Sequence, residues 1–140
     1  MAAFQKFNSF VEAMAEKKHD LGADTLRVML SNSAPLDTYS IKTDLVEITS
    51  GNGYVAGGNI AVGVSSAQTS GVYKLVLADP ATWTAVGGPM SPFRYAIIYN
   101  DDATNDELIG YWDYGSTVSL NAGDSFTVDF NGTNGVITIA

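Results

Sequence analysis

Apolar residues near the start of the chain follow a helical period. Between residues 4 and 20 they recur at three- and four-residue steps, and one stripe contains Phe4, Phe7, Val11 and Met14, widened by Phe10. Such a stripe is typical of an amphipathic helix, and Gly22 supplies a stop signal. We therefore predict a helix over residues 4–20, within an N-terminal helix or arm of residues 1–22. This arm either packs on its own domain or docks on a neighbouring subunit.

From Asp24 onward the period changes to two, which is the period of a β-strand. Leu26, Val28 and Leu30 alternate with Thr25, Arg27 and Met29. Turn residues separate the further strand candidates, which are residues 59–66 (alternating around Ile60, Val62 and Val64), 71–78, 92–100, 107–114, 116–120, 124–130 and 135–140. About eight strands with closely spaced turns predict a mainly β fold. We expect an antiparallel, jelly-roll-like β-sandwich in a single domain over residues 23–140.

The two most aromatic segments, residues 92–100 and 107–114, carry apolar side chains on both faces. In the first, one face is predicted to hold Phe93, Tyr95, Ile97 and Tyr99, and the other Arg94, Ala96, Ile98 and Asn100. Two apolar faces are typical of a central strand pair, or of a pair with one face covered by another chain. In residues 124–130, the alternation predicts that Phe126, Val128 and Phe130 point inward.

Composition narrows the classes of function. The 140 residues include 15 acidic and 7 basic ones, for a net charge of -8. This balance argues against nucleic-acid binding, which needs clustered Lys and Arg. The absence of Cys excludes disulfides and thiolate metal sites. No apolar run approaches the roughly 20 residues of a membrane span, and Lys6, Asn8 and Glu12 interrupt any signal-peptide core. We expect a protein that is made and folded in a cytoplasm and does not bind membranes.

Three sequence patterns match known binding or modification motifs, but each can also be explained as a loop or a turn. Residues 51–56 (GNGYVA) match the loose dinucleotide pattern, but a β-type run follows where a helix should hold the pyrophosphate. Residues 100–107 (NDDATNDE) cluster carboxylates that can either hold Ca²⁺ or form a solvated hairpin loop. The glycosylation sequon at Asn131 is interpreted as a turn, since the chain shows no export signal.

The sequence assembles no catalytic group. The single histidine, His19, lies near the end of the predicted helix, where a protonated imidazole favourably meets the helix C-terminus. No pair of carboxylates stands out within a strand pattern. We therefore predict no enzymatic activity, no cofactor and no metal site. Trp83, Trp112 and several Tyr can stack on sugars, so a carbohydrate-binding role stays open.

Several longer segments resemble a family of virion proteins. They are FNSFVEAMAEKKHDLGADTLRVMLSNSAP near the start, GNGYVAGGN in the middle, and PFRYAIIYND, LIGYWDYGS and SFTVDFNGTNGVITIA near the end. Together and in this order they resemble small structural proteins of tailed bacteriophages, of the type called capsid cement or decoration proteins. The resemblance spans nearly the whole chain and includes no catalytic signature.

The resemblance implies a structural protein on the outside of a phage capsid. Cement proteins bind at junctions between major capsid protein subunits, as dimers or trimers, and reinforce the shell. By this analogy we expect inter-subunit contacts from Phe4, Phe7 and Phe10 and from exposed aromatics such as Tyr54 and Trp83. The alternative is a tail or baseplate component with a receptor- or carbohydrate-binding role.

Overall fold

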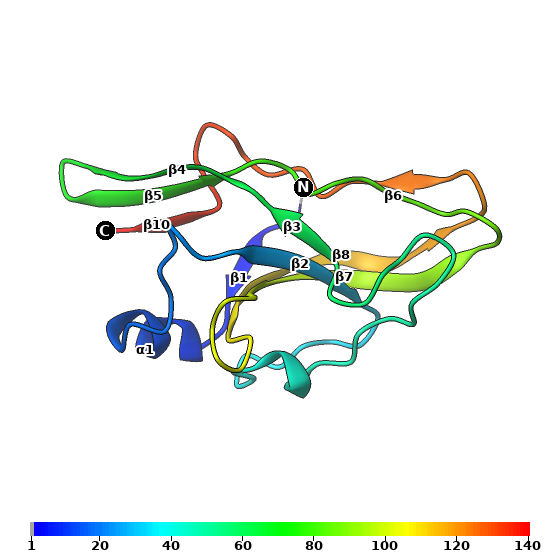
Figure 1. Ribbon diagram of the computed structural model, residues 1–140, viewed down its shortest axis with the longest axis horizontal. Helices are drawn as coiled ribbons and strands as arrows, with labels where there is room; N and C mark the ends of the chain where they lie inside the picture. Colours follow the sequence, from blue (N-terminus) through cyan, green and yellow to red (C-terminus); the bar gives the residue numbers. More distant parts are fainter. Residues whose placement is uncertain (1) are drawn as a thin grey trace.

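The computed structural model describes residues 2–140 and is mainly β, with antiparallel strands and one α-helix (Figure 1). The largest sheet has five strands in the order β1-β8-β7-β2-β3. Their bounds are β1 Phe4–Lys6, β2 Leu26–Ser31, β3 Asn59–Ala61, β7 Met90–Asn100 and β8 Leu108–Leu120. The two longest strands, β7 and β8, form a hairpin at the centre of this sheet.

Two smaller sheets pack over one face of the large one. A three-stranded sheet, β10-β5-β4, consists of β4 Gly63–Thr69, β5 Val72–Leu77 and β10 Ile137–Ile139. A two-stranded sheet pairs β6 Trp83–Thr84 with β9 Ser125–Phe126. The helix α1 covers Ser9–Ala15, and a single 3-10 turn covers Lys42–Asp44.

The predicted mainly β, antiparallel fold class is confirmed, and so is the presence of an N-terminal helix. The described residues form ten strands, more than the predicted number of about eight, because several are only two or three residues long. They are divided into sheets of five, three and two strands. With the smaller sheets packed over one face of the large sheet, the strands form the predicted sandwich-like fold.

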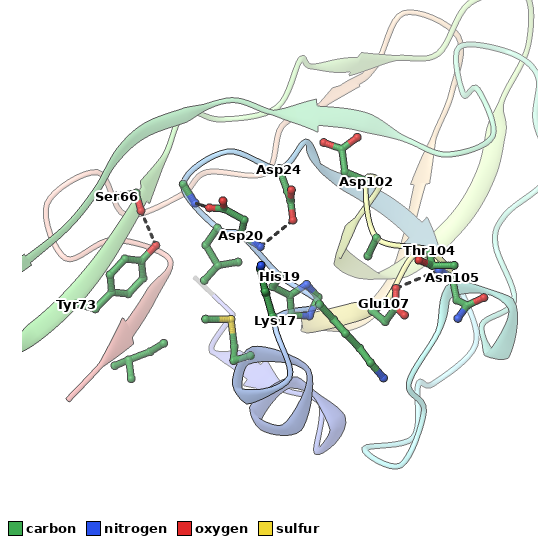
Figure 2. Close-up of a pocket in the computed structure, with 16 residues that line it drawn as sticks. Lys17, His19, Asp20, Asp24, Ser66, Tyr73, Asp102, Thr104, Asn105 and Glu107 are labelled. Atoms are coloured by element: carbon green, nitrogen blue, oxygen red, sulfur yellow. Dashed lines mark hydrogen bonds between the residues drawn. The ribbon is translucent and has the colours of Figure 1, made fainter.

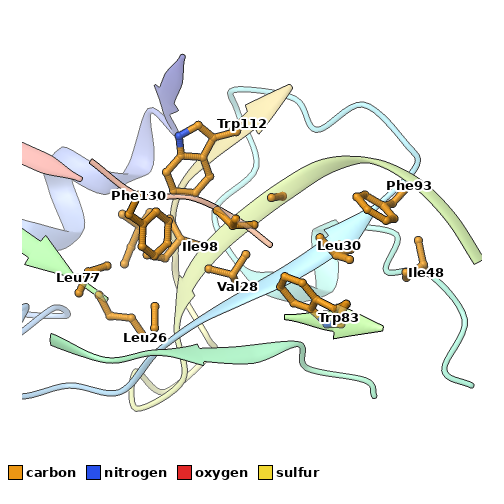
Figure 3. Packing of buried hydrophobic residues seen from close by; sticks show 14 of the residues in the cluster. Leu26, Val28, Leu30, Ile48, Leu77, Trp83, Phe93, Ile98, Trp112 and Phe130 are labelled. Atoms are coloured by element: carbon orange, nitrogen blue, oxygen red, sulfur yellow. The ribbon is translucent and has the colours of Figure 1, made fainter. Parts of the chain in front are cut away.

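The main core lies between the five-stranded sheet and the smaller sheets (Figure 3). Leu26, Val28 and Leu30 point into it from β2, as their alternation predicts. The opposing layer supplies Leu75, Leu77, Trp83, Phe130 and Ile137. Val128 and Phe130 point inward without belonging to a strand, because only Ser125 and Phe126 of the predicted strand 124–130 are paired.

A second apolar cluster covers the opposite face of the five-stranded sheet. It consists of Phe7, Met29, Tyr95, Ile97, Tyr99, Leu108 and Tyr111. Tyr39 and Leu45, from the segment between β2 and β3, pack against it. The central strand pair is therefore covered on both faces by its own chain.

Irregular pairing in the central hairpin changes the face of one predicted residue. Phe93 was expected beside Tyr95, but it packs in the main core, while Tyr95 lies in the second cluster. The pairing register between β7 and β8 shifts between these two residues. Because each shift of one residue exchanges the faces of a strand, simple alternation fails there.

The N-terminal segment differs from the predicted helix over residues 4–20. Residues 4–6 form β1, which pairs with β8 so that Phe4 lies opposite Trp112. The helix is limited to Ser9–Ala15. A glycine allows this arrangement, because a Cβ on Gly110 would overlap the ring of Phe4. Residues 4–6 are therefore an integral edge of the main sheet, and the helix is shorter than the predicted range of residues 4–20.

Removing the ring of Phe7 should destabilise the whole domain. This side chain is 0% exposed and its ring centroid lies 5.2 Å from that of Tyr111. We expect Phe7→Ala to lower the free energy of unfolding by about 3–5 kcal/mol, since it leaves a cavity in a packed cluster. Urea unfolding followed by circular dichroism measures this change.

Val11→Ala is the matched control, because Val11 lies on the same segment and is 57% exposed. It should change the free energy of unfolding by about 0.5 kcal/mol or less. If Phe7→Ala changed the free energy of unfolding as little as Val11→Ala does, the ring of Phe7 would not belong to the core.

Candidate functional site

The structure buries four of the five predicted interface residues, and two of the five line a groove. Phe4 is half-buried and Phe10 is 4% exposed, and both line a groove. Phe7 is 0% exposed, while Tyr54 and Trp83 are each 2% exposed. The predicted exposure of Tyr54 and Trp83 is therefore wrong. In this fold the four buried side chains, Phe10 among them, stabilise the protein's own interior.

Hydrogen bonding explains why Tyr54 is buried. Its hydroxyl donates to Oε1 of Glu47 at 2.7 Å and accepts the backbone N–H of Leu30 at 3.1 Å. Burial raises the pKa of the Tyr54 hydroxyl, so this group stays protonated. The glycine-rich loop of residues 50–58 is thereby tied to β2. The chain continues from that loop into β3 and not into a helix, as the dinucleotide pattern would have required.

An apolar groove of about 770 Å³ runs between the N-terminal segment and β10. Its walls are Phe4, Phe10, Val11, Met14 and Ala15 on one side and Val136, Ile137, Thr138, Ile139 and Ala140 on the other, with Lys6 as the charged side chain among the lining residues. Val11 is 57% exposed and Ile139 is 40% exposed. Large aliphatic side chains are thus presented to solvent along both walls.

The second wall of the groove also offers backbone hydrogen-bonding groups. β10 pairs with β5 along one edge, and within the described residues its other edge is unpaired. An extended apolar segment can therefore add main-chain hydrogen bonds while its side chains enter the groove. The signal for this wall in the sequence is GVITIA, residues 135–140, a predicted strand that either pairs inside a sheet or lies on an edge that a partner covers.

A second, more polar cleft of about 860 Å³ lies beside the segment that follows α1, and it shares Met14 and Ile139 with the groove (Figure 2). It lies between the residues that follow the helix, the β4–β5 hairpin and the loop between β7 and β8. Its lining includes Lys17, Lys18, His19, Asp20, Asp24, Ser66, Tyr73, Asp102 and Glu107. These side chains can donate and accept several hydrogen bonds at once, which suits a ligand with many hydroxyl groups.

The buried side chain of Asn100 holds several lining residues of this cleft together from beneath. Its Oδ1 accepts the backbone N–H groups of Asp102 and Ala103 at 3.0 and 3.2 Å. Its Nδ2 donates to Nδ1 of His19 at 3.0 Å and to Oδ2 of Asp24 at 2.6 Å. Because Nδ1 of His19 accepts, the imidazole proton resides on Nε2. That Nε2 is buried and has no hydrogen-bond partner among residues 2–140.

His19 is therefore a neutral side chain held in the interior. It is 5% exposed and lies 5.6 Å from the ring of Phe10, measured between ring centroids. Burial lowers the pKa of the imidazole below its ordinary value, although the carboxylates of Glu107 and Asp24 act in the opposite direction. The predicted role of a protonated histidine at the helix C-terminus is wrong, since α1 ends at Ala15.

The acidic loop that follows β7 is bound to β2 and to the residue before it through two aspartates. Asp101 forms an ion pair with Arg27 at 2.9 Å, and Oδ2 of Asp102 accepts the backbone N–H of Thr25 at 2.6 Å. Among residues 2–140, no three His, Asp or Glu side chains are grouped as metal ligands would be. The geometry of residues 100–107 thus agrees with a hairpin loop whose carboxylates bind the protein's own backbone and side chains.

Comparison with known proteins adds no identification. Neither a protein family model, nor a curated protein, nor a solved structure matches this chain. Within residues 2–140, no helix has both the length and the apolar character needed to cross a membrane.

The buried neutral imidazole predicts a pH dependence of stability. Because the folded pKa of His19 is lowered, the unfolded chain takes up a proton at a higher pH than the folded one. Stability is then fully present above the unfolded pKa of about 6.5 and is lost as pH falls from there through the folded pKa. Thermal unfolding between about pH 7.5 and about pH 5 measures this loss.

His19→Asn is the control for the same scan. Its amide oxygen can still accept a hydrogen bond from Asn100, but it cannot be protonated in this range. We expect the melting temperature of the variant to fall less steeply toward low pH. Parallel slopes for the two proteins would contradict a buried, neutral His19.

Proposed function

We propose that this protein is a structural component of a phage virion. It binds the outer surface of the capsid at junctions between major capsid protein subunits and stabilises the shell. The observation that carries this proposal is the open apolar groove between α1 and β10, to which Val11 and Ile139 contribute exposed side chains. The resemblance of the chain to capsid cement proteins supplies the identity of the partner.

The physical properties of the chain support a docking role. A rigid scaffold of antiparallel sheets loses little conformational entropy when it binds. Many copies on one lattice add avidity beyond the affinity of a single contact. A net charge of -8 disfavours adsorption to nucleic acid, which is abundant where virions assemble.

The groove defines the chemistry of the capsid contact. Its lining is mostly aliphatic and aromatic, so it should accept an apolar segment of the major capsid protein. The unpaired edge of β10 can hold that segment in an extended conformation through main-chain hydrogen bonds.

Acidic substitutions in the groove should abolish shell binding without unfolding the protein. We expect the double variant Val11→Asp/Ile139→Asp to lose at least about tenfold in affinity for empty expanded shells of the cognate major capsid protein, because burying a carboxylate is costly. Co-sedimentation with shells measures the affinity, and circular dichroism checks the fold.

Leu36→Asp is the matched control, since Leu36 is 55% exposed and does not line the groove. It should bind shells as the wild type does. If the wild-type protein fails to bind shells, the capsid proposal is wrong. If the groove variant binds as well as the control does, the groove is not the contact.

The polar cleft favours a second candidate function, a receptor- or carbohydrate-binding role in a phage tail or baseplate. Most aromatic side chains are buried, which removes them from sugar stacking, but Tyr73 is half-buried and lines the cleft. Carboxylates such as Asp24 and Asp102 beside an aromatic ring are a usual setting for sugar hydroxyls.

Substitution of Tyr73 distinguishes this second candidate from the first. If a glycan array gives a binding sugar, Tyr73→Leu should weaken that binding about tenfold, while Tyr73→Phe should retain most of it because the stacking ring is kept. Shell binding should be the same in both variants. The absence of any bound glycan, together with label on the capsid alone in electron micrographs of virions, would remove this alternative.

A further inference from the structure

One long stretch of this acidic chain carries no charge at all. Between Glu47 and Lys74 there is no Asp, Glu, Lys, Arg or His. The stretch nevertheless supplies much of the surface, because it includes five large aliphatic side chains that are 44–72% exposed. These are Val55, Ile60, Val62, Val64 and Val72. An uncharged, aliphatic surface on a protein of net charge -8 requires an explanation.

The stretch includes β4, whose outer edge is free. β4 pairs with β5 on one side, and no described strand pairs with its other side. All seven residues of β4 are exposed. Figure 1 shows the β4–β5 hairpin reaching away from the five-stranded sheet. Its outer edge is therefore accessible to another strand.

The turn of this hairpin determines which backbone groups face outward. Ser70 and Gly71 form a two-residue turn with φ of 50° and 82°, and Thr69 pairs with Val72. Residues that flank such a turn exchange hydrogen bonds with each other, and the pattern then alternates along the strand. The N–H and C=O groups of Ser66 and Gln68 thus point away from β5 and have no strand to bind.

The usual protections of an outer strand are mostly missing from β4. Natural sheets guard such edges with charged residues, Pro, bulges or covering loops. β4 has neither a charge nor a Pro, and its one irregularity lies between Gly63 and Ser65. Residues Ser65–Thr69 stay regular over about 17 Å, enough for a short antiparallel ladder.

We infer that a second copy of this chain pairs with this edge. Two β4 strands run antiparallel across a two-fold axis and join two three-stranded sheets into one sheet of six strands. The charge distribution selects a second copy as the partner. Two molecules of net charge -8 repel one another, and an uncharged element such as β4 allows them to approach without placing like charges face to face. Antiparallel self-pairing is also the contact that a two-fold axis generates.

The inference gives the exposed aliphatic residues a role. Val62 immediately precedes β4, Val64 lies at its start and Val72 lies across from its end, so pairing of two hairpins covers apolar surface on both copies. The contact is separate from the groove between α1 and β10. It does not depend on capsid binding, and it leaves the groove open to other proteins.

Two valines of equal exposure give a matched test. Val64 and Val86 are each 65% exposed, but Val86 lies outside the β4–β5 hairpin. We expect the full-length wild-type protein to be a dimer by sedimentation velocity. Val64→Lys should weaken dimerisation by about tenfold or more, because a charge at the edge opposes strand pairing, and Val86→Lys should leave it unchanged.

Amide hydrogen exchange provides the second readout. The amide hydrogens of Ser66 and Gln68 should exchange more slowly at concentrations where the dimer prevails than on dilution. The inference is overturned by a wild type that is monomeric at every concentration, by a trimer, or by a dimer that both lysine variants affect equally. A monomer that still binds shells would overturn this inference alone, and a dimer that binds none would overturn only the capsid proposal.

Discussion

The pairing of β7 with β8 is the constraint on which the rest of the structure depends. These strands are 11 and 13 residues long; β1 pairs with β8, β2 pairs with β7, and β3 joins the sheet through β2. Arg94 and Asp113 form a two-pronged ion pair across them at 2.7 and 3.0 Å, and this guanidinium holds the pKa of the Asp113 carboxyl below its ordinary value. The hairpin also places Glu107 among the lining residues of the polar cleft and the buried Asn100 beneath them.

Burial of this pair on both faces determines which side chains remain for binding. The rings of Trp112, Tyr95, Tyr99 and Tyr111 are used inside the molecule, where they fill the two clusters on either side of the sheet. The surface is left with aliphatic residues, above all valines, and with the groove between the first and last strands. A binding role for this chain therefore depends on aliphatic side chains and unpaired strand edges more than on exposed aromatics.

The period-two alternation of apolar residues correctly predicted those strands in which the same face points into the core along the whole strand. Leu26, Val28 and Leu30 point into the main core as expected, and the two-faced aromatic pair is central. The same reasoning failed for Phe4 and Phe7, because an apolar stripe at helical spacing also fits a short strand followed by a turn and a helix. It failed for Phe93 because a shift in register exchanged the faces.

The candidate surfaces were harder to predict than the fold. Asn100 is 81 residues from His19 and 76 residues from Asp24 along the chain, and only the tertiary structure brings it beside them under the polar cleft. Val62 and Val64 alternate like core residues, yet both are exposed, one immediately before β4 and the other within it. The alternation of apolar residues in a sequence shows which face of a strand is apolar. It does not show whether another sheet, helix or loop covers that face.

The absence of a single carbon atom at Gly110 has a mechanical consequence. The ring of Phe4 occupies the space where any other residue at that position would place its Cβ, so β1 lies flat against β8 only because this position is bare. That strand is also one wall of the apolar groove. Gly110 thus determines how closely β1 approaches β8, and with it the position of Phe4 in the wall of the groove. A methyl group at position 110 would overlap the ring of Phe4 and displace that wall.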